Sequence, residues 1–213
     1  MMRPSDGWFA DVLLERPPRE VRAAALALVD KGLSTRDIYL DVLAPALVEV
    51  GLRWQLGRAS VAQEHLATAL VTSVMAILAP RLGASESRGL HAVLACTDGE
   101  LHAVGLRMVS DFLEADGWEV SHLGAVTPGE VLARFVRDRR PDVVGISTTL
   151  TTHLDAARDT ISMLQDLPGR PFILVGGRAH GGDAGVALNL GADAFGFDAE
   201  SAVRLLRTRF LDD

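Results

Sequence analysis

One histidine stands where imidazole chemistry could reach a ligand. His102 lies in the E-x-H-x-x-G segment of residues 100–105, after an apolar run over residues 91–96 and before an amphipathic run over residues 106–113. This order predicts a strand, a turn and a helix, which places the turn at the carboxyl end of a sheet, where doubly wound folds bind ligands. An imidazole there could coordinate the metal of a cofactor. The alternative is a solvated turn histidine, because so short a motif also occurs by chance.

Small and hydroxyl-bearing residues follow two further apolar runs. The sequence Ser-Thr-Thr-Leu occupies residues 147–150 after the run over residues 143–146, and Gly176-Gly177 follow the run over residues 172–175. Parallel strands of one sheet end at the same edge, so these residues are expected beside the histidine turn. The paired glycines would remove side chains where a ligand has to enter between strand ends.

The second half of the chain alternates apolar and amphipathic runs, which is typical of an α/β fold with parallel strands and right-handed crossovers. A five-stranded flavodoxin-like (Rossmann-like) sheet fits this length. A nucleotide site is less favoured, because the first turn, residues 97–105, lacks G-x-G-x-x-G. The predicted strands lie near residues 90–96, 118–123, 142–147, 171–176 and 193–197.

The first half is helical in pattern to about residue 80, and it predicts four short helices in an antiparallel bundle. Pro17-Pro18 and Ser34-Thr35 are helix starts, and Ser60 with Gln63 forms a capping box. Pro45 is expected to divide one helix, because proline lacks a backbone donor. The predicted organisation is a bundle over residues 1–81, a linker over residues 82–89 and an α/β domain over residues 90–213.

Composition limits the classes of function. A formal charge of −7 and a pI near 5.3 argue against direct binding of nucleic acid, which depends on clustered Lys and Arg. The chain shows no secretory signal and no uninterrupted apolar run of the roughly 18 residues that cross a bilayer, so we expect a cytoplasmic protein with no membrane contact. The single Cys96 excludes internal disulfides and is expected to be a small buried residue.

Taken together, the motifs of the second half resemble those of cobalamin-binding domains. Glu100-x-His102-x-x-Gly105, Ser147 with Thr149, and Gly176-Gly177 are similar to the family's D-x-H-x-x-G, S-x-L and G-G pattern. The resemblance implies that His102 is the lower cobalt ligand in place of the cofactor's own benzimidazole. It implies that Glu100 orients the imidazole, and that a channel for the benzimidazole tail is lined by Ser147, Thr149, Gly176 and Gly177.

Two departures from the family pattern stand in this chain. Glu100 replaces the usual aspartate and Thr149 replaces the leucine. His153 stands where methyltransferase modules carry a relay hydroxyl, so protonation control of methyl transfer is not expected. Gly105 would let the following helix pack closely on the sheet. The expected cofactor-binding set also includes Leu101, Val104, Gly105, Leu150 and His153.

The helical half carries Trp54, nine intervening residues and then Glu64-His65. At about 1.5 Å rise per residue, Trp54 and His65 project at one level of a helical hairpin. This W-x9-E-H element resembles that of cobalamin-dependent photoreceptors of the CarH/LitR type. The resemblance implies adenosylcobalamin as cofactor, with Trp54 against its adenosyl group and Glu64 as a polar contact. It also implies that light breaks the cobalt–carbon bond and that His65 then becomes the upper cobalt ligand.

The DNA-binding photoreceptors carry a further domain before the bundle, whereas only about 18 residues precede it here. Output is therefore expected through a homo-oligomer or through an unknown downstream protein. The layout is also similar to that of photocobilins, which use cobalamin together with a bilin. A bilin such as biliverdin would be held noncovalently, with His153, Arg178 and His180 as lining residues.

The sequence leaves three functions open. The favoured one is a non-enzymatic light sensor that binds adenosylcobalamin. The alternative is a corrinoid methyl carrier of a methyltransferase system, which needs an open cobalt face that His65 would obstruct. The third is a flavodoxin-like or nucleotide-binding domain without a corrinoid, in which His102 is a solvated turn residue.

Overall fold

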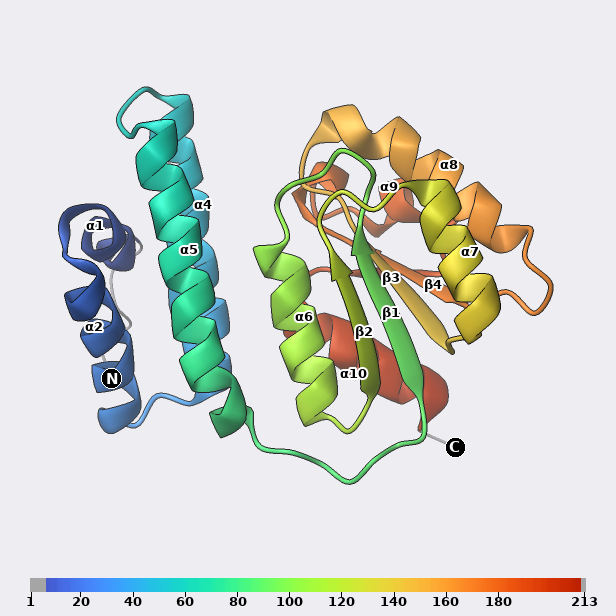
Figure 1. Ribbon diagram of the computed structural model, residues 1–213, viewed down its shortest axis with the longest axis horizontal. Helices are drawn as coiled ribbons and strands as arrows, with labels where there is room; N and C mark the ends of the chain where they lie inside the picture. The colour runs from blue at the N-terminus through green and yellow to red at the C-terminus, as the bar shows by residue number, and fades with distance from the viewer. Residues whose placement is uncertain (1–6, 212–213) are drawn as a thin grey trace. The chain divides into compact units, whose positions relative to one another are not determined.

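The computed structural model describes residues 7–211, which form two compact units divided between Gly83 and Ala84. The first unit is made of helices, and the second is a parallel sheet covered by helices (Figure 1). Each unit has its own set of buried apolar side chains.

The first unit is a helical bundle in which α1 contacts α2, α4 and α5. Pro18 occupies the first turn of α2, and Ser60 and Gln63 form the predicted capping box at the start of α5. The helix α1 lies before the first helix start that the sequence predicts. The elements of the first unit are α1 (Trp8–Glu15), α2 (Pro18–Asp30), α3 (Thr35–Asp37), η1 (Ile38–Leu43), α4 (Ala44–Gln55), α5 (Val61–Leu78) and η2 (Ala79–Leu82).

Pro45 does not divide its helix, contrary to expectation. Residues 35–55 are helical throughout, and the π-helical turn η1 ends just before the proline. The Ala44 amide bonds to the carbonyl of Tyr39, five residues back. This wider turn shifts the carbonyls that the proline ring would otherwise meet, so the helix continues past a residue with no amide hydrogen. The Tyr39 hydroxyl then donates to the Met75 carbonyl at 2.9 Å and joins this helix to α5.

The stretch Val61–Leu82 is long and apolar enough to cross a membrane by length and composition alone. It is not an uninterrupted apolar run, because Gln63, Glu64 and His65 lie near its start. One such helix is weak evidence for a membrane span, since the core helix of a bundle passes the same test. In the first unit α5 contacts α1, α2 and α4.

The second unit confirms the predicted α/β fold. Its five strands are all parallel and lie in the order β2-β1-β3-β4-β5, which is the flavodoxin-like arrangement. Helices α6 and α10 cover one face of the sheet, and α7, α8 and α9 cover the other (Figure 1). The strands are β1 (His91–Cys96), β2 (Glu119–Gly124), β3 (Val143–Ser147), β4 (Phe172–Gly176) and β5 (Ala194–Gly196). The helices are α6 (Val104–Ala115), α7 (Gly129–Arg139), α8 (Leu154–Gln165), α9 (Ala184–Asn189) and α10 (Ala199–Phe210), with short turns η3 (Thr151–His153) and η4 (Arg178–His180).

The central strands β1, β3 and β4 are apolar along most of their length, because both faces of the sheet are covered. All of β3 is buried, and Val144 and Ile146 pack in one cluster with Leu132 of α7 and Ile161 of α8. Burying an aliphatic side chain of this size stabilises a fold by about 1.5–3 kcal/mol. The carboxyl ends of β1, β3 and β4 therefore form a rigid base for the loops that follow them.

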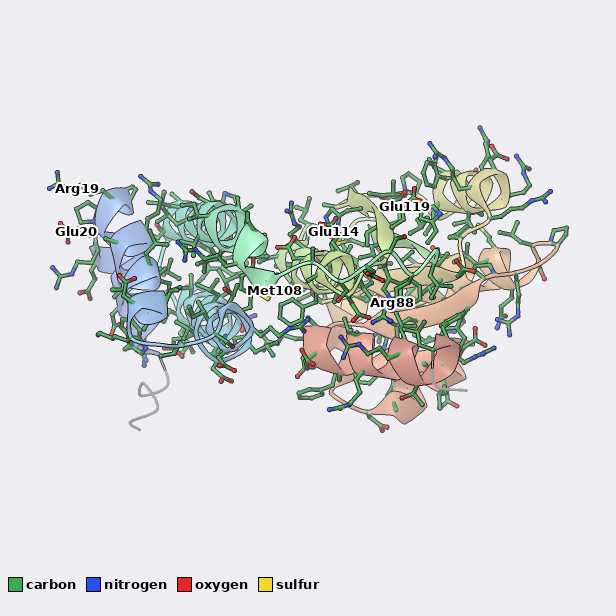
Figure 2. All side chains as sticks on the ribbon, turned by 90° about the horizontal axis from the view of Figure 1, so that it is seen from below. Arg19, Glu20, Arg88, Met108, Glu114 and Glu119 are labelled. Atoms are coloured by element: carbon green, nitrogen blue, oxygen red, sulfur yellow. The ribbon has the colours of Figure 1, made fainter. Side chains whose placement is uncertain are left out.

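The segment expected to be a linker is bound to the second unit. The amides of Ser85 and Arg88 donate to the carbonyls of Ala115 and Gly117 at 2.9 and 2.8 Å. The Arg88 side chain, labelled in Figure 2, donates to the Asp116 carbonyl at 2.9 Å. The buried Asp116 carboxylate also accepts a hydrogen bond from Arg207 of α10 at 2.8 Å. These bonds fix the segment before β1 to the end of α6.

Asp193 joins the starts of β4 and β5. Its carboxylate accepts two hydrogen bonds from the Arg170 guanidinium, at 2.8 and 2.9 Å, and one from the Ile173 amide at 2.8 Å. Burial by itself raises the pKa of the Asp193 carboxyl, but these hydrogen bonds outweigh it and hold the pKa below its ordinary value of 3.8. The charged form of Asp193 therefore stabilises this corner of the sheet.

Asp193→Asn is expected to lower the free energy of unfolding by about 1–2 kcal/mol at neutral pH, because a charged bidentate pair becomes a neutral one and solvent screens the partly exposed Arg170. Since the folded pKa of Asp193 lies below the unfolded pKa, its contribution is present above about pH 4 and is lost as the pH falls through the folded pKa. Urea denaturation at several pH values measures this. Asp155→Asn, in an exposed pair with Arg158, is the control. Equal stability of Asp193→Asn and the wild type at neutral pH would contradict the account.

Candidate functional site

Three sequence motifs meet at the carboxyl edge of the sheet. Cys96 at the end of β1 pairs with Ser147 of β3, and Ser147 pairs with Gly176 of β4. The turns that follow these strands are therefore neighbours. The Thr97 amide donates to the Ser147 carbonyl at 3.0 Å, and the Thr148 amide donates to the Gly176 carbonyl at 3.0 Å.

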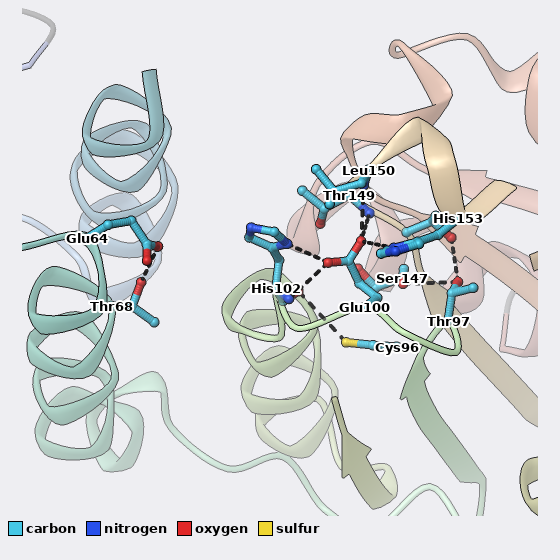
Figure 3. Close-up of polar contacts among 11 residues, drawn as sticks. Glu64, Thr68, Cys96, Thr97, Glu100, His102, Ser147, Thr149, Leu150 and His153 are labelled. Atoms are coloured by element: carbon cyan, nitrogen blue, oxygen red, sulfur yellow. Dashed lines mark hydrogen bonds and ion pairs between the residues drawn. The ribbon is translucent and has the colours of Figure 1, made fainter. Parts of the chain in front are cut away.

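Glu100 is the centre of this edge, and its side chain is fully buried. One carboxylate oxygen, Oε1, accepts hydrogen bonds from the backbone amide of His102 at 3.1 Å and from the Nδ1 atom of the same residue. The other, Oε2, accepts from the amides of Thr149 and Leu150 at 2.8 and 3.0 Å and contacts Nδ1 of His153 at 3.2 Å. Figure 3 shows this network, in which one carboxylate joins the turn after β1 to the turn after β3.

The charge on Glu100 is stable despite its burial. Burial raises the pKa of the carboxyl, but hydrogen bonds from the His102 side chain and from the His102, Thr149 and Leu150 amides outweigh it and lower the pKa to about 2. At neutral pH Glu100 is therefore an ionised carboxylate, which only accepts hydrogen bonds.

An acceptor-only carboxylate fixes the tautomer of its histidine partners. Because Glu100 Oε1 has no proton to donate, Nδ1 of His102 must carry the hydrogen of their contact. In the neutral ring the lone pair then lies on Nε2. The His102 side chain is 46% exposed, so Nε2 can reach a ligand. A histidine whose Nδ1–H is held by a carboxylate is a common arrangement of metal-binding imidazoles.

The remaining predicted residues of this unit lie around the network. Leu101 is 73% exposed in the turn after β1, and Leu150 is exposed in the turn after β3. Val104 begins α6, and Gly105 is in its first turn. A Cβ atom on Gly105 would meet no atom within 4 Å, so the expectation that this glycine permits close packing on the sheet is wrong.

The paired glycines at the end of β4 are needed by the backbone itself. Gly177 has a φ of +101°, and a Cβ atom there would lie 2.2 Å from the Thr148 carbonyl oxygen. A Cβ on Gly176 would lie 3.0 Å from the Gly196 carbonyl oxygen. Any side chain at position 177 would push the turn after β4 away from the turn after β3.

A bond between Thr97 and Thr148 joins these turns; Thr148 lies in the expected Ser-Thr-Thr-Leu segment, but Thr97 and the bond were not predicted. The hydroxyls of Thr97 and Thr148 lie 2.7 Å apart, and both residues are buried. Their position directly after buried strands was the available signal, because a buried hydroxyl has to find a partner. This bond fixes the turn that carries Glu100 beside the turn that supplies its amide donors.

Cys96 and His180 are buried near this edge. Burial and the nearby charge of Glu100 raise the pKa of the Cys96 thiol to about 12, so it is no nucleophile at neutral pH. His180 of η4 is also buried, and its burial lowers its pKa. Its ring lies 5.6 Å from the Phe195 ring between centroids, whereas Arg178 of the same turn is exposed.

Trp54, Glu64 and His65 belong to the first unit. Trp54 lies in the last turn of α4 and is half-exposed, and the other two lie near the start of α5. Glu64 accepts a hydrogen bond from the Thr68 hydroxyl at 3.1 Å (Figure 3). The His65 side chain is 74% exposed, and its Nε2 lies 3.6 Å from the Glu64 carboxylate. The bundle therefore presents an aromatic ring and an imidazole from two helices that pack together.

Each unit matches a known protein-family model. A B12 binding domain model matches residues 90–207, and a second B12 binding domain model matches residues 10–79. The HTH-type transcriptional repressor CarH of Myxococcus xanthus is 38% identical over 156 residues, which are 73% of this chain and 52% of that protein. The chain spans about half the length of the CarH and CarA repressors that it matches.

Corrinoid proteins of Methanosarcina are similar over more of their own length. The dimethylamine corrinoid protein of Methanosarcina barkeri is 29% identical over 185 residues, which are 84% of this chain and 86% of that protein. The solved structure of the monomethylamine corrinoid protein of M. barkeri covers 95% of this chain with a TM-score of 0.83 and 19% identity, and 97% of that chain is matched, a likeness that shows the fold. This chain belongs to the family of proteins with a B12 binding domain, whose ligand is cobalamin.

Proposed function

We propose that this chain is a light sensor that binds adenosylcobalamin, with His102 as the lower cobalt ligand. The observation that carries the proposal is the hydrogen bond from Nδ1 of His102 to the Glu100 carboxylate, which leaves the Nε2 lone pair for a metal. A single imidazole supplies one coordination position, which suits a cobalt ion that a corrin ring already holds. Ser147, Thr149, Gly176 and Gly177 would line the channel for the displaced benzimidazole tail.

The bundle would supply the response to light. Adenosylcobalamin contributes a cobalt–carbon bond that light breaks. Trp54 would pack against the adenosyl group, with Glu64 as a polar contact, and His65 would bind cobalt from above after that group leaves. The exposure of the His65 side chain and its long contact with Glu64, at 3.6 Å, support this role. The 38% identity to CarH supports it as well.

The output would be a change in contacts with other chains. CarH is named as a transcriptional repressor. We infer a cytoplasmic, non-enzymatic module that acts through self-association or an unidentified protein partner, without direct contact with nucleic acid. A noncovalent bilin such as biliverdin beside His153, Arg178 and His180 would be a second chromophore, since the buried Cys96 thiol is unsuited to covalent attachment.

A corrinoid methyl carrier is the second candidate. The observation in its favour is that the dimethylamine corrinoid protein of M. barkeri matches over 86% of its own length. A carrier must leave the upper cobalt face open to its partner methyltransferases, whereas a sensor closes that face with His65. The two functions therefore differ in what His65 does after illumination.

His102→Ala is expected to abolish the spectrum of histidine-ligated, base-off cobalamin and to weaken binding by at least tenfold, because the lower ligand is lost. Absorption titration of the apoprotein with adenosylcobalamin in the dark measures both effects. His91→Ala is the matched control. His91 is the first residue of β1, at the opposite end of the strand from the His102 turn, and its side chain bonds to Ser121. An unchanged spectrum in His102→Ala would end the ligand assignment.

Glu100→Gln is expected to lower the free energy of unfolding of the apoprotein by about 2–4 kcal/mol, because the amide group would turn a donor toward donors in a buried site. The same variant should bind cobalamin more weakly, since its single amide oxygen cannot accept from Nδ1 of His102 and from the turn after β3 at the same time. Urea denaturation and cobalamin titration provide the two measurements. The exposed Glu119→Gln should match the wild type in both, and a Glu100→Gln chain as stable as the wild type would contradict the role of the network.

His65→Ala is expected to change the product of illumination while leaving dark binding of adenosylcobalamin within about twofold, since His65 acts only after the adenosyl group leaves. Wild-type protein should give a bis-histidine spectrum after green light, and the variant should give that of a water-ligated cofactor. Thr72→Ala, on an exposed position of the same helix, should behave as the wild type. Identical light products from His65→Ala and the wild type would favour the methyl carrier.

A further inference from the structure

Among the described residues, two that are not glycine have a positive φ, Val126 at +53° and Arg140 at +48°. The left-handed region crowds the Cβ atom against the following carbonyl, and a β-branched residue suffers most. Backbone strain of this kind persists only where the surrounding structure imposes it, and it gathers at functional sites.

The conformation of Arg140 is explained by the end of a helix. Arg140 follows α7 directly, and its amide donates to the Val136 carbonyl at 2.8 Å. A left-handed residue is the ordinary way to end a helix with such a bond. Arg140 also lies before β3, at the amino edge of the sheet and away from His102.

Val126 ends no helix. It lies in the loop between β2 and α7, and its amide donates to the carbonyl of Glu100 at 3.1 Å. The amide of Glu100 in turn donates to the Thr97 carbonyl at 2.9 Å. The strained residue therefore braces the turn that holds Glu100 and His102. A glycine or an asparagine would make the same backbone bond with far less strain, so the bond does not explain the valine side chain.

The core does not explain the side chain either, because Val126 is 48% exposed. Other exposed apolar side chains occur on the loops at this same edge: Leu101 after β1, Leu150 after β3 and Phe197 after β5. The fold does not use this exposed isopropyl group, although the Val126 backbone bonds to the turn that carries Glu100 and His102. Contact with a ligand would account for it.

We propose that Val126 is a ligand-contact residue whose strained backbone holds its isopropyl group against the corrin ring bound at His102. The inference rests on the proposed cobalamin binding. A valine has a single side-chain torsion, and the fixed loop places it before the ligand arrives. Contact with the ring therefore loses little conformational freedom. The cost is carried by the apoprotein, which is less stable than it would be with a residue suited to the left-handed region.

The test compares two variants that relieve the strain with a control that relieves strain elsewhere. Val126→Gly and Val126→Asn both suit a positive φ, and neither carries an apolar side chain. They are expected to raise the thermal midpoint of the apoprotein by about 3–6 °C. They are also expected to weaken the binding of adenosylcobalamin in the dark by about fivefold to tenfold. Arg140→Gly removes strain at the opposite edge and should leave the dissociation constant within about twofold of the wild type.

Three outcomes would overturn the proposal. Val126→Gly and Val126→Asn that are more stable but bind adenosylcobalamin as tightly as the wild type would show that the side chain makes no ligand contact. Variants that are no more stable would show that the valine is not strained. Equal weakening in Arg140→Gly would assign the effect to strain relief in general. Failure of the wild-type chain to bind adenosylcobalamin is a distinct result, since it would refute the proposed function itself.

Discussion

The buried carboxylate of Glu100 is the interaction on which the carboxyl edge of the sheet depends. It accepts hydrogen bonds from the backbone amide and the Nδ1 atom of His102 and from two amides of the turn after β3. These bonds lower its pKa to about 2. A buried charge is costly unless its lone pairs are satisfied, so the turns have little freedom to move apart. The same charge selects the tautomer of His102. The Glu100 carboxylate therefore both joins the two turns in the folded chain and prepares His102 to bind a metal.

The sheet makes this arrangement possible. Cys96, Ser147 and Gly176 end neighbouring strands in register, so residues more than forty positions apart come within hydrogen-bond reach. Gly177 lets the turn after β4 approach the Thr148 carbonyl. The glutamate has one methylene more than the aspartate of the family pattern, and its two oxygens serve different turns. This chain therefore ties its ligand turn to the rest of the edge through a single side chain.

The sheet and the motifs at its edge could be predicted from the sequence, because buried parallel strands are apolar runs and their ends share an edge. The contact of Glu100 with His153 could not, since it depends on how the turn after β3 folds back. The positive φ of Val126 contradicts the residue's preference and so leaves no signal in the sequence. Pro45 was misjudged because a π turn, which local propensity does not predict, carries the helix past it.

The central claim is that a histidine nitrogen of this chain replaces the cofactor's own benzimidazole on cobalt. Electron paramagnetic resonance of the bound cofactor in its cobalt(II) state tests it most directly, because the axial nitrogen splits each cobalt line. Protein grown with histidine labelled by the nitrogen isotope of spin one half, loaded with unlabelled cobalamin, should show doublets in place of triplets. Triplets that persist in the labelled protein would show that the benzimidazole stays on its metal, and the account would be wrong.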